Sequence, residues 1–133
     1  MSIEHIQPGG LFQAEGMSHV VIGEGRMAFI AGQGSYDENF QLVGPGDYRA
    51  QTLQAFRNLT LALAAAGAGP EQVVSSTMYV VGLDAAVTEI FVEAMSEALD
   101  GHPFPPHASS LVGVAQLAYP EMLVEISAIA VLG

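Results

Sequence analysis

The sequence contains no cysteine and no lysine, and its basic side chains are three arginines. Without thiols there is no disulfide, no thiol nucleophile and no cysteine-ligated zinc or iron-sulfur centre. Without lysine there is no Schiff-base nucleophile, and a P-loop would have no lysine to reach a phosphate. These two absences exclude several large classes of enzyme.

Long hydrophobic runs are also missing. The longest apolar stretch, near residues 59–68, is too short to span a bilayer. The first residues show no basic segment followed by an apolar core, so we expect a cytoplasmic protein that does not bind membranes. Fourteen acidic residues against three basic ones give a formal charge of -11 at pH 7. Such a charge repels phosphate backbones over a Debye length of roughly 8 to 10 Å, so we expect no nucleic-acid partner.

The 133 residues, half of them apolar, are enough for one domain, which we expect to be residues 1–133. Apolar periodicity predicts the order β-β-α-β-α-β-β, and an extra short strand at the N-terminus stays open. The expected strands are 18–23, 27–31, 73–81, 108–117 and 123–132, and the expected helices are 47–67 and 84–99.

Glycine and aspartate mark the ends of these elements. Gly25, between the first two of these strands, predicts that they form a hairpin. Gly67 is a typical residue to follow the end of the first helix, and Asp84 is a typical N-cap for the second.

Two helices of this length can cover only one face of a sheet of about four to six strands. The last strand is nevertheless apolar on both sides, since Val124 and Ile126 alternate with Leu123 and Ile129. The second face therefore needs a cover. We expect an α+β fold that assembles as a homo-oligomer, with the sheets packed against one another.

A segment with three prolines precedes the fourth of these strands and can be neither helix nor central strand. It carries His102 and His107 close to Asp100, a grouping that could ligate a metal, but the two are also ordinary loop histidines and no HExxH spacing supports a metal site. Ser109 and Ser110 follow His107, but the Gly-x-Ser-x-Gly motif of a nucleophile elbow is missing. We expect no metal and no cofactor.

Glu125 is a carboxylate inside the most apolar strand of the chain. Burying it without a partner would be costly. Two interpretations stay open: a structural ion pair or a hydrogen-bonded position at a sheet edge, or a functional acid or base with a raised pKa.

Short motifs in a fixed order extend over nearly the whole chain. They are residues 29–33, 50–52 with Ala55, Asn58 and Leu63, 66–68, 73–74, Thr77 with 79–80, and 124–126 with 128–130. Together they resemble the Rid family (RidA/YjgF, the reactive-intermediate deaminases, once labelled endoribonuclease L-PSP). The resemblance implies a chorismate-mutase-like α+β fold, a homotrimer with an internal barrel of sheets, and three ligand clefts between subunits.

The resemblance also implies hydrolysis of small enamines and imines to a keto acid and ammonia. The family's deaminases hold the substrate carboxylate with an arginine on the strand after the proline loop, and activate water with backbone carbonyls and a glutamate on the last strand. Glu125 matches the glutamate, so it is the expected catalytic residue. Ser109 stands where the arginine belongs, so this sequence lacks the cation.

Other departures gather at the same cleft. The family has a tyrosine at the position of Met17, a serine at that of Ala31, an asparagine at that of Thr88 and a cysteine at that of Leu111. The positions expected to bind substrate are Met17, Gly32, Phe91, His107, Ser109 and Leu111.

An arginine-carboxylate pair has two charge-assisted hydrogen bonds, each worth roughly 1.5 to 3 kcal/mol, whereas Ser109 can supply one neutral bond. We therefore expect a hydrolase of the RidA type whose preference is shifted away from carboxylated imines. The alternative is a trimeric protein that binds or senses a small molecule without catalysis. Ribonuclease activity, the older label, is disfavoured because three arginines hold RNA poorly.

Overall fold

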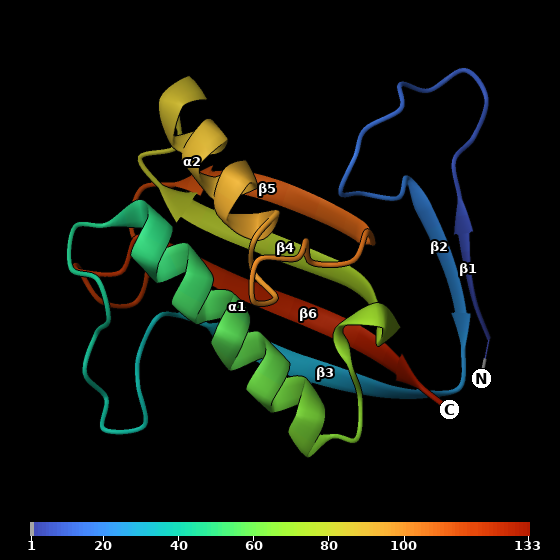
Figure 1. The fold of residues 1–133 in the computed structure, drawn as a ribbon, viewed down its shortest axis with the longest axis horizontal. Coiled ribbons are helices and arrows are strands. Elements are labelled where there is room, and N and C mark those ends of the chain that lie inside the picture. Colours follow the sequence, from blue (N-terminus) through green and yellow to red (C-terminus); the bar gives the residue numbers. More distant parts are fainter. Residues whose placement is uncertain (1) are drawn as a thin grey trace.

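The computed structural model describes residues 2–133, which fold into two sheets and two α-helices (Figure 1). The elements are β1 (Ser2–Ile6), β2 (Val20–Glu24), β3 (Arg26–Gln33), α1 (Tyr48–Ala65), a 3-10 turn (Pro70–Gln72), β4 (Val73–Val81), α2 (Ala85–Met95), β5 (Ala108–Val114) and β6 (Val124–Leu132). The expected order is confirmed, with the N-terminal strand β1 added.

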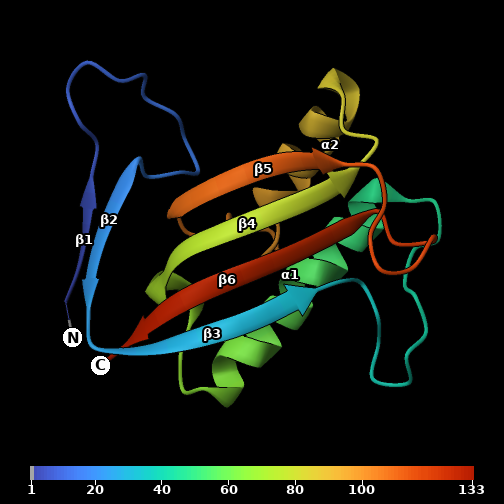
Figure 2. The ribbon, with the colours of Figure 1, turned by 180° about the vertical axis from the view of Figure 1, so that it is seen from behind.

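The main sheet has the strand order β3-β6-β4-β5. Strand β6 is antiparallel to both neighbours, and β4 runs parallel to β5. Both helices lie on one face of this sheet, as the views from the two sides show (Figures 1 and 2). We call the opposite face the open face, because no helix of the described chain covers it. The α+β fold class and the one-sided placement of the helices are therefore confirmed.

The expected hairpin of the first two predicted strands is wrong. Strand β2 pairs with β1 in a separate two-stranded sheet, whereas β3 pairs with β6. The turn between β2 and β3 contains Gly25 at a φ of 137°, a conformation that favours glycine. A Cβ there would also collide with the carbonyl oxygen of Leu132. The chain thus redirects at Gly25 instead of folding back on itself.

The helix ends follow local sequence signals. The carboxylate of Asp47 accepts a hydrogen bond from the Ala50 amide at 3.0 Å, and that of Asp84 accepts one from the Val87 amide at 2.8 Å. Gly67, at a φ of 79°, follows the C-terminus of α1. Helix α2 ends at Met95, four residues before the predicted end, because the chain continues in turns there.

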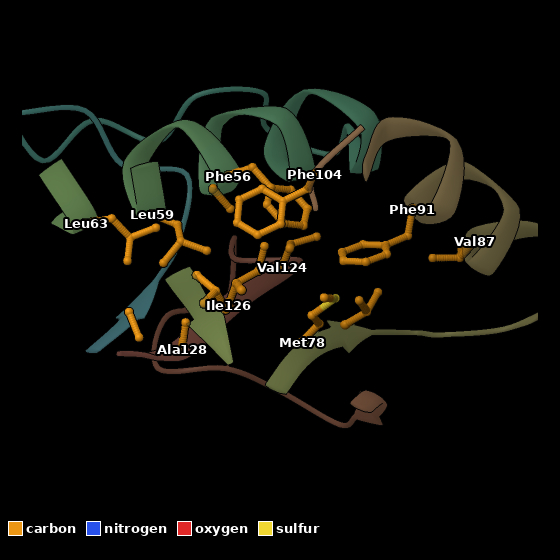
Figure 3. Close-up of a cluster of buried hydrophobic side chains, with 14 residues drawn as sticks. Phe56, Leu59, Leu63, Met78, Val87, Phe91, Phe104, Val124, Ile126 and Ala128 are labelled. Carbon is orange, nitrogen blue, oxygen red and sulfur yellow. The ribbon is translucent and has the colours of Figure 1, made fainter. Parts of the chain in front are cut away.

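The core fills the space between the helices and the covered face of the sheet (Figure 3). Phe56 of α1 and Phe91 of α2 meet there with ring centroids 6.1 Å apart. Phe104 packs on Phe56 at 5.0 Å and is 1% exposed, so the proline-rich segment is ordered by its own aromatic anchor.

Large apolar side chains remain bare on the open face. Phe29 is 71% and Met27 53% exposed, and both project from β3 on this side. The β1–β2 ribbon covers one end only, where Gly23 lies close against Val74 and Val131. Neither helix described here is long and apolar enough to cross a membrane.

Candidate functional site

Glu125 projects from β6 onto the open face, directly opposite Tyr79 of β4. Its neighbours in the strand, Val124 and Ile126, are fully buried on the other side. The carboxylate lies against Gly32 of β3: a Cβ placed on Gly32 would be 2.5 Å from both Cδ and Oε2 of Glu125. The carboxylate can occupy this space because Gly32 has no side chain.

A structural role for Glu125 finds no support within one chain. Strand β6 is flanked by β3 and β4, so Glu125 is not at a sheet edge. In the part of the chain that the structure describes, the ion pairs are those of Arg49 with Glu93 and Glu97. Glu125 is thus a partly exposed carboxylate without an ionic partner, able to orient a water molecule or accept its proton.

The arginines lie elsewhere. Arg49 and Arg57 belong to α1, on the covered side of the sheet, and Arg57 lines a surface groove of about 770 Å³ between α1 and the turn after α2. Arg26 begins β3, opposite Leu132 at the end of β6. Within residues 2–133, no guanidinium lies beside Glu125.

Ser109 and Leu111 lie on the opposite side of the sheet from Glu125. In the parallel β4–β5 pair, Ser76 faces Ser109 and Met78 faces Leu111. Paired residues project to the same side, and Met78 is buried under the helices. One chain therefore does not bring Ser109 and Glu125 together.

His107, just before β5, is 1% exposed. Its Nε2 lies 2.6 Å from Oγ of Ser76, and its Nδ1 lies 2.9 Å from the carbonyl oxygen of Pro105. A carbonyl can only accept, so Nδ1 carries the proton and Nε2 accepts from the Ser76 hydroxyl. Burial lowers the pKa of His107. Both ring nitrogens of His107 are thus occupied. Phe91 is also buried in the core, with 2% of its surface exposed. In a single chain neither side chain is available to a ligand.

Met17 joins this region through an isolated parallel bridge to His107. It also lines a cavity of about 590 Å³, with Ser18, His5 and Pro105 among the other lining residues. Of the positions expected to bind substrate, Met17 and Ser109 lie close to His107, whereas Gly32 lies against the catalytic candidate Glu125. Phe91 is part of the core and Leu111 packs against it.

The site residues expected from the sequence do not include Ser76, Ser18 or His5. Ser76 and Ser18 are 5% and 4% exposed, and Nδ1 of His5 lies 2.8 Å from Oγ of Ser18. The sequence did contain one signal. Ser76, Met78 and Val80 lie at every second position of β4 and so share its buried side, where a hydroxyl needs a hydrogen-bond partner.

The structure does not bring His102 and His107 together as a metal site would require. His102 is exposed whereas His107 is buried. In residues 2–133, no three His, Asp or Glu side chains lie close enough together to hold a metal ion.

A polar framework supports the chain just after Gly32. The Asn58 side chain of α1 donates to the carbonyl oxygens of Gly34 and Tyr36, both at 2.8 Å. The Tyr36 hydroxyl donates to Glu121 at 2.8 Å, and burial together with this carboxylate raises the pKa of Tyr36 to about 12. The framework explains why α1 carries Asn58, one of the motif residues.

Two helices on one face of a mixed sheet form an α+β arrangement that this chain shares with solved structures of Rid proteins. The chain belongs to the family described as Endoribonuclease L-PSP, whose model matches residues 12–132.

Three solved structures illustrate the likeness. The Rid-family protein YyfB of Yersinia pestis, of unknown function, is 38% identical with a TM-score of 0.87, covering 99% of this chain and 100% of that one. A putative endoribonuclease of Thermotoga maritima is 30% identical with a TM-score of 0.68, covering 98% of each chain. Rv2704 of Mycobacterium tuberculosis, a YjgF-family protein, is 30% identical with a TM-score of 0.62, covering 98% of this chain and 100% of that one. No match was found among curated proteins.

Proposed function

We propose that this protein hydrolyses a small imine, enamine or related labile metabolite without a cofactor, in clefts between the subunits of a cytoplasmic homotrimer. The observation that carries the proposal is the carboxylate of Glu125, which lies over Gly32 on the open face with no ionic partner among the described residues. Membership of the family supports it.

The division of the site between two faces supports a cleft between copies. Ser109 and Glu125 project to opposite sides of one sheet, so a pocket that uses both needs two chains. The bare apolar side chains of β3, among them Phe29 at 71% exposure, give neighbouring copies a surface to bury.

In this proposal Glu125 acts as a general base. A water molecule attacks the imine carbon while the carboxylate accepts one of its protons. The carboxylate returns that proton to the nitrogen, which gives a carbinolamine with a hydroxyl and an amino group on the same carbon. The carboxylate then accepts the hydroxyl proton and passes it to the amino nitrogen, the carbon-nitrogen bond breaks, and ammonia leaves a carbonyl product. Imine and water are thereby converted to carbonyl compound and ammonia with no oxidant or reductant.

The preferred substrate is neutral or cationic. No guanidinium of the described chain lies near Glu125, and Ser109 offers one neutral hydroxyl. Losing an arginine-carboxylate pair weakens transition-state binding of a carboxylated imine by roughly 10² to 10⁴-fold. The charge of -11 further disfavours anions.

The test is ammonia release from imines generated in situ from a panel of amino acids and amines. The wild-type protein accelerates release from uncharged imines, and Glu125→Gln abolishes the acceleration without changing the oligomer. Glu89→Gln, which changes an exposed carboxylate on α2, is the matched control. Turnover that is unchanged in Glu125→Gln removes this residue from the mechanism.

A second function, binding or sensing a small molecule without turnover, is favoured by the same missing cation. A ligand that raises the melting temperature and is recovered unchanged would support it. Ribonuclease activity is disfavoured: Arg49 is engaged by two glutamates, which leaves two arginines for RNA.

A further inference from the structure

Three segments of the chain meet at His107: β4, the segment of Met17 and Ser18, and the proline-rich segment that carries His107 itself. Its ring contacts Ser76 of β4 and the Pro105 carbonyl, as described above. Its own carbonyl accepts a hydrogen bond of 3.0 Å from the Ser18 amide, and the neighbouring Met17 forms the parallel bridge with it. The imidazole and the ring of Phe104 form a T-shaped pair, with centroids 5.6 Å apart.

Each contact bears on a residue expected to line the cleft. The bridge holds Met17 beside His107, and β5 begins one residue later, which places Ser109 opposite Ser76. We call Met17, Ser76, His107 and Ser109 the β5 cluster. With its side chain buried, His107 influences a ligand through the placement of Met17 and Ser109.

We propose that the buried Ser76–His107 pair is the positioning element of the proposed cleft, and that it holds the β5 cluster together only while the imidazole is neutral. The proposal deepens the proposed function and rests on it for its effect on turnover. Its effect on the structure of the β5 cluster stands independently.

The hydrogen bonds explain the need for neutrality. The Ser76 hydroxyl donates to Nε2, which can accept only when it carries no proton. On protonation both ring nitrogens become donors, so the hydroxyl must turn and the charge must be buried. Protonation of His107 therefore weakens the contacts within the β5 cluster, because the strands around the cluster are held by their own backbone hydrogen bonds.

The surroundings oppose the charged form. Burial lowers the pKa of His107, the Pro105 carbonyl works against that shift, and the nearby His5 lowers the pKa further. His5 itself faces Ser18. Glu15 and Glu71 are among the residues that line the adjoining cavity, and as acidic residues they act in the opposite direction to burial and His5. The neutral pair is therefore complete above the ordinary histidine pKa of about 6.5, and it is lost progressively at lower pH.

The Ser18 amide is the direct reporter, because its hydrogen bond ends on the His107 carbonyl. We expect amide hydrogen exchange, read by NMR, to show a protection factor at Ser18 that falls roughly tenfold in Ser76→Ala. The same fall is expected in the wild type between pH 7.5 and pH 5, after correction for intrinsic exchange. Protection in α1 and β6 stays constant. Ser96→Ala, which removes an exposed hydroxyl, is the matched control and leaves Ser18 unchanged.

The nitrogen resonances of His107 provide a second measurement that needs no variant to fold. We expect the tautomer with the proton on Nδ1. A proton on Nε2 at pH 7.5, or Ser18 protection that does not change with pH, overturns the proposal. In the imine assay Ser76→Ala raises KM about fivefold or more with little change in kcat. Glu125→Gln, by contrast, abolishes turnover and leaves Ser18 protected, which separates a failure of the proposed function from a failure of this inference.

Discussion

Gly32 and Glu125 share one space on the open face: the carboxylate of Glu125 lies where any side chain at position 32 would have to be, 2.5 Å from a Cβ. The contact joins two strands, β3 and β6, that are about 90 residues apart in the sequence. It makes the orientation of the carboxylate depend on the absence of a methyl group.

Gly32→Ala is therefore expected to displace the carboxylate and lower kcat for imine hydrolysis roughly tenfold or more. Gly9→Ala is the control, because a Cβ there meets nothing within 4 Å. Steady-state kinetics check this prediction. Full activity of Gly32→Ala would mean that the position of the carboxylate is not critical.

An arginine placed at position 109 of β5 tests whether the lack of a cation there sets the substrate preference. Ser109→Arg is expected to raise kcat/KM for a carboxylated imine by about 10² to 10⁴-fold and to leave an uncharged imine unaffected. Ser96→Arg adds the same charge at an exposed position after α2 and should change neither rate. An equal gain in both variants would point to general electrostatic attraction instead of a specific contact.

The open face is expected to be the surface at which copies associate. Phe29→Glu places a charge at a side chain that is 71% exposed in one chain, and it should convert the proposed trimer to smaller species. Leu61→Glu, at a residue 64% exposed on α1, is the matched control and should keep the trimer. Light scattering with size-exclusion chromatography measures the mass. A wild-type monomer at micromolar concentration would refute the assembly.

Stability is expected to depend on pH through His107. Burial lowers its pKa in the folded state, so the unfolded chain binds more protons below about pH 6.5 and the free energy of unfolding decreases as the pH falls. Urea denaturation at pH 7.5 and 5.5 measures the effect. His107→Gln should reduce the pH dependence, whereas the exposed His102→Gln should not. An identical pH dependence in the wild type and His107→Gln would contradict the assignment.

The aromatic core predicts a large difference between two positions on the same helix. Phe56 is fully buried between Phe91 and Phe104, so Phe56→Ala should lower the free energy of unfolding by about 3–5 kcal/mol. Leu61→Ala, on the exposed side of α1, should cost less than about 0.5 kcal/mol. Denaturation with urea distinguishes the two.

Where the sequence prediction failed, the deciding contacts were distant in the chain. Gly25 marked a turn correctly, yet nothing nearby shows that the strand after it pairs with β6 and not with β2. The contact of His107 with Ser76 joins residues that are 31 positions apart, and the sequence around His107 does not show it. Neither the pairing of β3 with β6 nor the contact of His107 with Ser76 can be inferred from residues that are close by in the sequence.

The amino-acid sequence by itself determined most of the elements, because period, capping side chains and glycines act over a few residues. Asp47 and Asp84 cap the N-termini of the two helices, and Gly67 follows the C-terminus of α1, through bonds and dihedral angles of their immediate neighbours. It also determined the acidic charge and the absence of a cation at position 109. Only the tertiary structure decided which side of the sheet each site residue faces and which residues meet across it. The side of the sheet to which a residue projects follows from strand register, and register is set by the packing of the whole sheet against the helices.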